Sequence, residues 1–227
     1  MYALLFAEGA DEIAVLSLVL QRAGMTVSAT GDLERALQGW AERPPDLIVM
    51  AIQRTDPMPF VRRVRAETEV ALILVADATD ERSQCALLEH GADLFVPRPF
   101  SARLLIAQVR ALVRRSNGMP IMSLPTLQLA GLTLNPETRT VQVTGRPPQR
   151  LTYLEFRLLY TLMIHRGQVI PTDTIVERVW GYGEKGDRDL VRGLISRLRA
   201  KIESDPQQPR FVMTVSGVGY SFRKDSE

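Results

Sequence analysis

The sequence predicts two folded domains: an α/β domain with a five-stranded, doubly wound parallel sheet, followed by an α+β domain. The chain has 227 residues, which is enough for two domains that each bury a core. In the first half, five short apolar runs alternate with amphipathic stretches, a pattern typical of parallel strands joined by crossover helices. A segment rich in Gly, Ser and Pro then precedes a different pattern of short strands, three helices and a hairpin.

The first domain is expected to span residues 1–115. Its strands are predicted at 3–6, 25–29, 47–52, 71–76 and 94–96. Its helices are predicted near 11–23, 32–42, 57–67, 81–90 and 101–115. The carboxyl ends of the strands should form the functional crevice of such a sheet.

The second domain is expected to span residues 127–227, after a linker at 116–126. Thr152 and Glu155 have the spacing of a capping box that opens a helix, and Gly167 is expected to close it. Further helices are predicted at 172–179 and 188–203, and a hairpin is predicted at 211–222.

Composition excludes several classes of protein. Hydrophobic residues make up 45% of the chain, and charges of both signs are interspersed, as in a globular protein. The N-terminus lacks a basic region, and no apolar run is long enough to cross a bilayer, so a cytoplasmic protein without a membrane partner is expected. Cys85 is the single cysteine and is interpreted as a small buried side chain. Neither a cofactor nor a metal is expected.

Charge is distributed unevenly between the two halves. Residues 1–115 contain 13 Arg, no Lys and 15 acidic residues, a formal charge of −2, whereas the remainder carries +4. A modestly basic second half is compatible with a polyanionic partner, although many domains without one have a similar charge.

Four segments of the first half, LLFAEG, PPDLIVMA, GADLFV and RPF, resemble the CheY-like receiver domain of two-component response regulators. In that family the crevice binds Mg²⁺ through an acidic pair after the first strand and through an Asp that ends the third strand, and this Asp accepts the phosphoryl group. A hydroxyl residue and a Lys complete the site. Here Glu8 and Gly9 stand at the positions of the acidic pair, and Ala51 stands at the position of the phosphoacceptor. Ala76 replaces the hydroxyl residue, and Arg98 replaces the Lys.

These replacements predict a receiver that has lost its phosphorylation chemistry. Ala51 offers no carboxylate to attack phosphorus, and Glu8 alone is a poor ligand set for a hard dication. Asp46 and Asp56 flank the third strand but are interpreted as turn residues rather than substitute acceptors. Arg98 is expected either to pair with Glu8 or to be solvated.

Receivers of this family often pair through the fourth helix, fifth strand and fifth helix, and the resemblance suggests a homodimer of the same kind. Polar or apolar residues replace several of the charged positions of that face, although Asp93 and Arg110 remain charged. An apolar two-fold interface is the hypothesis, and burial of the leucines in the core is the alternative. The expected interface residues are Gln84, Leu87, Leu94, Leu104 and Gln108.

The second half resembles the winged-helix DNA-binding domain of OmpR/PhoB-type regulators. The resemblance covers residues 127–224 and is carried by LTYLEFRLL, the Val-Trp-Gly of 179–181, ISRLRAKIE and TVSGVGYSF. It implies a recognition helix at about 188–203, a wing in the final hairpin, and a loop at 181–187 that could face RNA polymerase.

The third helix of this domain has a pattern suited to a DNA groove. One stripe, formed by Val191, Leu194, Ile195, Leu198 and Ile202, is expected to face inward. Arginines on the opposite face can donate to phosphates or to guanine edges in the major groove, and Arg197 is expected at the edge of that face, near a phosphate. The predicted DNA-contacting residues, including two from the wing, are Arg188, Arg192, Ser196, Arg197, Arg199, Thr214 and Ser216.

Two departures from the family pattern bear on base preference. Asp189 and Arg192 exchange the family's Arg and Asp positions, and Ser216 stands where the family usually has a basic wing residue. A different preferred sequence and a weaker wing contact are therefore expected.

The function predicted from the sequence is a transcription regulator that binds specific double-stranded DNA independently of aspartyl phosphorylation. An enzyme is disfavoured, because His90 and His165 have no evident Ser, Cys or metal partner in the pattern. The alternative is a protein-interaction module of a signalling pathway that has kept the fold but lost specific DNA binding.

Overall fold

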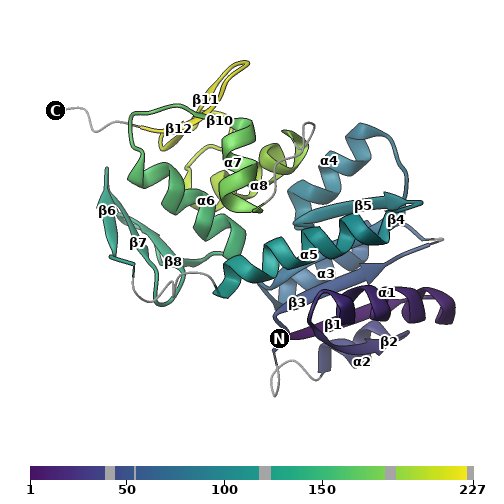
Figure 1. The fold of residues 1–227 in the computed structure, drawn as a ribbon. Coiled ribbons are helices and arrows are strands. Elements are labelled where there is room, and N and C mark those ends of the chain that lie inside the picture. Colours follow the sequence, from purple (N-terminus) through teal and green to yellow (C-terminus); the bar gives the residue numbers. More distant parts are fainter. Residues whose placement is uncertain (39–43, 54, 118–123, 182–187, 224–227) are drawn as a thin grey trace. The chain divides into compact units, whose positions relative to one another are not determined.

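The structure, a computed structural model, describes residues 1–38, 44–53, 55–117, 124–181 and 188–223. The chain divides into two compact units, Met1–Arg114 and Arg115–Glu227, which are described separately below (Figure 1). Of the predicted linker at 116–126, residues 118–123 lie outside the described part. No described helix is both long and apolar enough to span a bilayer.

The N-terminal unit is built on a five-stranded parallel sheet with the order β2-β1-β3-β4-β5. All five residues of the central strand β3 are buried, because helices cover both faces of the sheet. The predicted α/β fold is confirmed. The strands are β1 (Tyr2–Ala7), β2 (Thr26–Thr30), β3 (Leu47–Ala51), β4 (Ala71–Asp77) and β5 (Leu94–Arg98).

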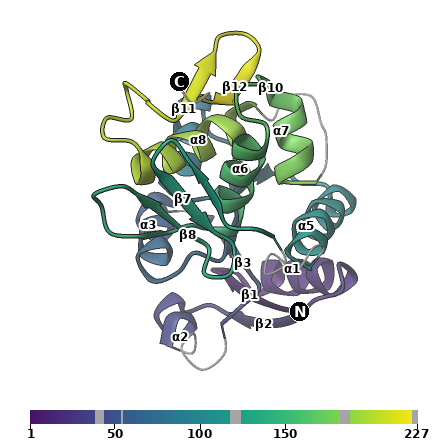
Figure 2. The same cartoon turned by 90° about the vertical axis from the view of Figure 1, so that its left-hand side faces the viewer.

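Helices α1 to α4 connect these strands and α5 follows β5, with α1 and α5 on one face of the sheet and α2, α3 and α4 on the other (Figures 1 and 2). Arg110 of α5 donates to the carbonyl of Arg22 at the end of α1, at 2.5 Å. Residues 39–43, where the second predicted helix was expected to end, lie outside the described part. The helices are α1 (Ala10–Arg22), α2 (Leu33–Gln38), α3 (Met58–Glu67), α4 (Glu81–His90) and α5 (Ala102–Asn117).

A buried ion pair links α3 to β5 in this unit. Arg65 Nη2 lies 2.6 Å from Asp93 Oδ2, and the Asp93 side chain has no exposed surface. The same oxygen accepts from Leu72 N at 2.9 Å, and Arg65 also donates to the carbonyl of Gly91. Because both charges have several partners, the pair satisfies groups that burial would otherwise leave without hydrogen bonds.

The C-terminal unit places three helices between two small antiparallel sheets (Figure 2). A four-stranded sheet has the order β6-β7-β8-β9, and a three-stranded sheet has the order β10-β12-β11. The two-residue strands β9 and β10 are too short to leave a periodic signal in the sequence. The strands are β6 (Leu127–Leu129), β7 (Leu132–Asn135), β8 (Thr140–Val143), β9 (Gln149–Arg150), β10 (Ile170–Pro171), β11 (Val212–Val215) and β12 (Gly219–Phe222).

The three helices begin and end close to the predicted positions. They are α6 (Tyr153–Ile164), α7 (Thr172–Val179) and α8 (Arg188–Ile202). The capping box is confirmed, since Thr152 accepts from Glu155 N and Glu155 accepts from Thr152 N. Helix α6 ends at Ile164, slightly before Gly167, whose φ of 76° turns the chain toward β10.

The core of the C-terminal unit lies where α6, α7 and α8 meet. The predicted inward stripe of α8 is confirmed, because Val191, Leu194, Ile195, Leu198 and Ile202 are all buried. Gly219 allows β12 to approach β10, since a Cβ atom at this position would lie 2.0 Å from the carbonyl oxygen of Ile170. This packing holds the β11–β12 hairpin, residues 212–222, beside the helices; the hairpin is called the wing below.

Candidate functional site

The first candidate site is the crevice at the carboxyl ends of the parallel strands. Ala51 ends β3 and Ala76 lies in β4, and both methyl side chains are buried. Gly9 precedes α1 as its N-cap, and Glu8 follows β1. Arg98 is the last residue of β5. The predicted crevice positions are therefore gathered at one edge of the sheet.

Arg98 occupies the crevice as part of a mostly buried network. Its Nη2 and Nε lie 2.5 and 2.8 Å from Glu12 Oε1, and its Nη1 donates to the carbonyl of Ile52 at 2.8 Å. Only 17% of the Arg98 side chain and 9% of the Glu12 side chain are exposed. Asp77 adds a longer contact at 3.4 Å from a largely exposed carboxylate. The guanidinium thus supplies a positive charge in this crevice from within the protein.

Arg98 fits neither of the two expectations, pairing with Glu8 or solvation, because it is mostly buried and paired with Glu12. Glu8 instead accepts from Gln53 N at 2.9 Å and from Thr55 Oγ1 at 3.0 Å. Gln53 also donates to the second carboxylate oxygen of Glu12. Glu12 lies in the first turn of α1, four positions after Glu8, and sequence reasoning missed this second acid near the same crevice.

The predicted pairing face is only partly exposed. Leu87 of α4 and Leu94 of β5 are each 3% exposed, because both pack into the core of the N-terminal unit. These two residues are therefore core residues, as in the alternative interpretation. Leu104 is 38% exposed, and Gln84 and Gln108 are partly buried.

Of the two charged residues retained on that face, Asp93 is buried and Arg110 is exposed. Asp93 is buried against Arg65, and Arg110 donates to the carbonyl of Arg22 in its own unit.

The second candidate site is the outer face of α8. Arg188 and Arg192 are exposed, and Ser196 is partly exposed on the next turn. Arg192 Nη2 lies 3.1 Å from Asp189 Oδ1, so the exchanged Arg and Asp positions form an ion pair between residues i and i+3. Half of the Arg192 side chain remains accessible to a partner.

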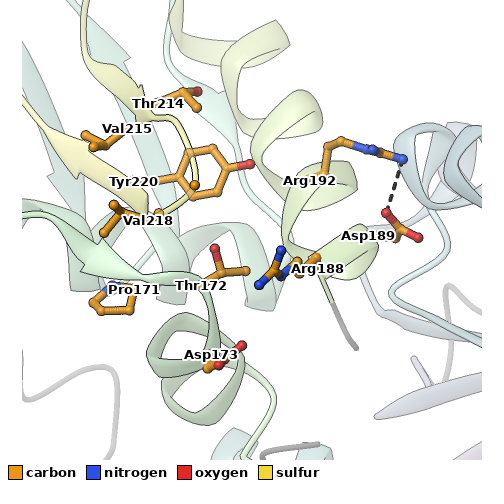
Figure 3. A pocket seen from close by; sticks show the side chains of 12 residues that line it. Pro171, Thr172, Asp173, Arg188, Asp189, Arg192, Thr214, Val215, Val218 and Tyr220 are labelled. Carbon is orange, nitrogen blue, oxygen red and sulfur yellow. Dashed lines mark ion pairs between the residues drawn. The ribbon is translucent and has the colours of Figure 1, made fainter. Parts of the chain in front are cut away.

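A groove of about 290 Å³ lies between α8, the start of α7 and the wing. In Figure 3, Arg188 extends from α8 toward Thr172 of α7, and the hydroxyl of Tyr220 points from the wing toward α8. Desolvation by burial raises the pKa of Tyr220 above its ordinary value, and its protonated hydroxyl can donate a hydrogen bond. A groove with arginines on one wall and hydroxyls on another can hold a phosphate backbone.

Arg197 does not lie where the sequence suggested. Its side chain is 8% exposed, and its Nε lies 4.0 Å from Glu155 Oε1, a carboxylate that also binds Lys201 Nζ at 2.8 Å. Arg197 faces α6 because the inward stripe of α8 is broader than its apolar residues alone indicate. The proposed phosphate contact of Arg197 is therefore corrected to an internal ion pair.

Arg199 is also bound within the protein. Its Nη2 donates to the carbonyl of Val212 at 2.7 Å and to Thr214 Oγ1 at 2.8 Å. Desolvation by burial lowers the pKa of Arg199 below its ordinary value.

Thr214 is exposed on the wing and Ser216 follows it at the tip, as expected for residues that can contact DNA. Of the loop at 181–187, residues 182–187 lie outside the described part of the chain.

A doubly wound parallel sheet followed by a winged-helix unit defines the architecture of a response regulator with a DNA-binding output domain. Comparison with known families agrees with this assignment. Residues 9–110 match the response regulator receiver domain, and residues 145–222 match the family described as transcriptional regulatory protein, C terminal.

Whole-chain relatives show the same arrangement. The chain is 35% identical over 208 residues to the DNA-binding response regulator MtrA of Mycobacterium tuberculosis (strain ATCC 25618 / H37Rv), covering 91% of this chain and 90% of that protein. It is equally similar to MtrA of Mycobacterium leprae (strain TN), with 91% of both chains covered. A solved structure of a RitR mutant has the same fold, with a TM-score of 0.78, 23% identity and 99% of each chain covered. The chain belongs to the OmpR/PhoB-type DNA-binding response regulators.

Proposed function

We propose that this protein is a transcription regulator that binds specific double-stranded DNA and does not use aspartyl phosphorylation as its signal. The observation that carries the proposal is the pairing of Arg98 with Glu12 in a crevice where Ala51 ends β3. Ala51 has no oxygen with which to attack phosphorus, and the paired guanidinium supplies the positive charge that a metal ion would bring.

DNA recognition is assigned to the accessible side chains around the groove. Arg188, Arg192 and Ser196 lie on the outer face of α8, and Thr214 and Ser216 lie on the wing. Exposed arginines on a helix can make bidentate contacts to guanine in the major groove, whereas the wing hydroxyls fit phosphate contacts. Arg197 and Arg199 are left out of this set because protein groups already bind them.

The proposal is tested by selecting genomic fragments with the full-length protein and then measuring affinity across a salt series. Specific binding should persist after treatment with acetyl phosphate, with the same affinity as in untreated protein. Arg192→Ala should lose affinity for the selected sequence. Arg35→Ala is the matched control, because it removes an exposed arginine from α2 in the other unit.

Two results would contradict the proposal in different ways. A change in affinity after acetyl phosphate treatment would show that the receiver still responds to phosphorylation. Equal, weak binding to selected and scrambled duplexes would instead favour the alternative function, a protein-interaction module without specific DNA binding.

Self-association through the N-terminal unit is a further part of the proposal. After Leu87 and Leu94 are assigned to the core, the exposed Leu104 and the partly buried Gln84 and Gln108 are what remains of the predicted pairing face. Sedimentation of the untreated full chain should show a dimer at micromolar concentration that Leu104→Glu dissociates, whereas a monomeric wild-type protein would refute this part.

A further inference from the structure

The outer edge of β11 is the starting point of the inference. β11 is the last strand in the order β10-β12-β11, so within the described part of the chain one of its edges has no strand partner. Backbone groups on such an edge need hydrogen bonds from elsewhere, or the strand is only loosely held. In this protein, side chains from the end of α8 supply several of the hydrogen bonds to this edge of β11.

Two residues one helical turn apart bind the same backbone position. Arg199 Nε and Nη2 donate to the carbonyl of Val212 at 3.1 and 2.7 Å. Glu203 Oε1 accepts from Val212 N at 3.0 Å and from Phe211 N at 2.8 Å, and Glu203 Oε2 accepts from Arg210 N at 2.8 Å. Both backbone groups of Val212 therefore face the end of α8 rather than β12.

The contact extends along the strand toward the DNA-facing part of the wing. Arg199 Nη2 also donates to Thr214 Oγ1 at 2.8 Å, and Thr214 lines the groove beside α8. Glu203 is 4% exposed, and Arg199 is half-buried, so water competes poorly for these bonds. Charge-assisted hydrogen bonds of this kind are stronger and more directional than neutral ones.

We infer that Arg199 is a positioning residue that fixes the angle of the wing against the recognition helix, and that it is not itself a DNA contact. This inference rests on the proposed DNA-binding function and assigns a role to one residue of that interface. A wing held at a fixed angle contacts DNA at a set distance from the bases that α8 reads, because both elements then move as one body. Loss of the Arg199 contact leaves the α8 side chains in place but removes the bonds to Val212 O and Thr214 Oγ1, so that the wing is held less firmly, through Glu203 and the pairing of β12 with β10.

The first experiment measures the wing without DNA. Hydrogen exchange of the full chain should be about tenfold faster for amides of residues 211–222 in Arg199→Ala, because charged hydrogen bonds are lost there. Exchange in α7 should not change. Arg199→Lys should restore part of the protection, since a lysine can reach one acceptor but not both. Thr214→Val should give a smaller increase than Arg199→Ala.

The second experiment measures coupling between the wing and DNA. In the wild-type background, Ser216→Arg should add a phosphate contact and steepen the salt dependence of binding by about 1. In the Arg199→Ala background, most of that increase should be lost, because the new arginine is on a wing that is held less firmly. If Arg199→Ala fails to fold, the effect of Ser216→Arg on the salt dependence is measured in the Arg199→Lys background instead.

Two outcomes would overturn the inference. Unchanged exchange in the wing of Arg199→Ala would show that the contact does not hold the hairpin. An equal gain from Ser216→Arg in both backgrounds would show that Arg199 acts independently of the wing, as a direct DNA contact does. Absence of DNA binding in every variant and in the wild type would refute the proposed function alone, because the exchange result does not depend on DNA.

Discussion

Replacing Arg98 with Met tests whether the internal ion pair holds the receiver crevice together. The substitution removes the charge but keeps most of the side-chain volume. Glu12 then remains as a carboxylate that is 9% exposed, with the Gln53 amide 3.2 Å away as a neutral donor. The Ile52 carbonyl also loses its contact with Arg98.

The expected cost follows from the burial of the pair. Breaking a fully buried pair costs about 3–5 kcal/mol, because one charge is left without its partner. Water reaches this site in part, since 17% of Arg98 is exposed and the nearby Asp77 side chain is 65% exposed. We therefore expect a loss of about 2–3 kcal/mol, which lowers the melting temperature of a domain of this size by roughly 10–20 °C.

The assay is urea unfolding of the full chain followed by circular dichroism, with hydrogen exchange to assign the change to residues 1–114. Arg63→Met is the matched control, because Arg63 pairs with Glu34 and Glu67 on an exposed surface and should give no measurable change. The double variant Arg98→Met/Glu12→Leu should recover part of the loss, since no buried charge remains. Equal stability of Arg98→Met and Arg63→Met would refute the reasoning.

Three further predictions concern phosphorylation, base reading and pH. Acetyl phosphate should leave no acid-stable, base-labile phosphoryl group on residues 1–114, because Ala51 has no acceptor oxygen; such an adduct in mass spectrometry would contradict this. Arg192→Ala should weaken binding to the selected sequence by about 1–3 kcal/mol and relax preference at one base pair, as measured by binding to single-substituted duplexes. The free energy of unfolding should fall as the pH rises above about 10, the unfolded pKa of tyrosine, because burial raises the pKa of Tyr220 in the folded state. That fall should be smaller in Tyr220→Phe, and an identical pH dependence of the two proteins would argue against the burial effect.

Local patterns were sufficient to predict most elements of both domains, but not the two-residue strands β9 and β10. Five apolar runs became β1 to β5, and the spacing of Thr152 and Glu155 predicted the start of α6. These predictions succeeded because strand burial, helix periodicity and capping depend on residues a few positions apart. The strand pattern predicted a crevice where the parallel strands bring their carboxyl ends together, and the resemblance to receiver domains assigned Glu8, Ala51 and Arg98 to it.

Side-chain partners across the fold were not predictable in this way. Arg98 and Glu12 are 86 positions apart, and the choice of Glu12 over Glu8 depends on how α1 packs against the sheet. Arg197 and Arg199 belong to one helix and both looked outward-facing in the sequence, yet α6 covers the first and the wing binds the second. Helical periodicity identifies the faces of a helix but not how much of its circumference neighbouring elements cover.

The sequence by itself determined the two-domain architecture, the family, and the absence of an acceptor oxygen at Ala51, because these depend on residue identity and regular spacing. Only the tertiary structure decided which charges remain available to a partner. Arg188 and Arg192 stay exposed, whereas Arg98 and Arg199 are bound to protein acceptors. The physical reason is that a charged side chain can stay partly buried only where packing brings a carboxylate or carbonyl within hydrogen-bonding distance, and those acceptors come from elements distant in sequence.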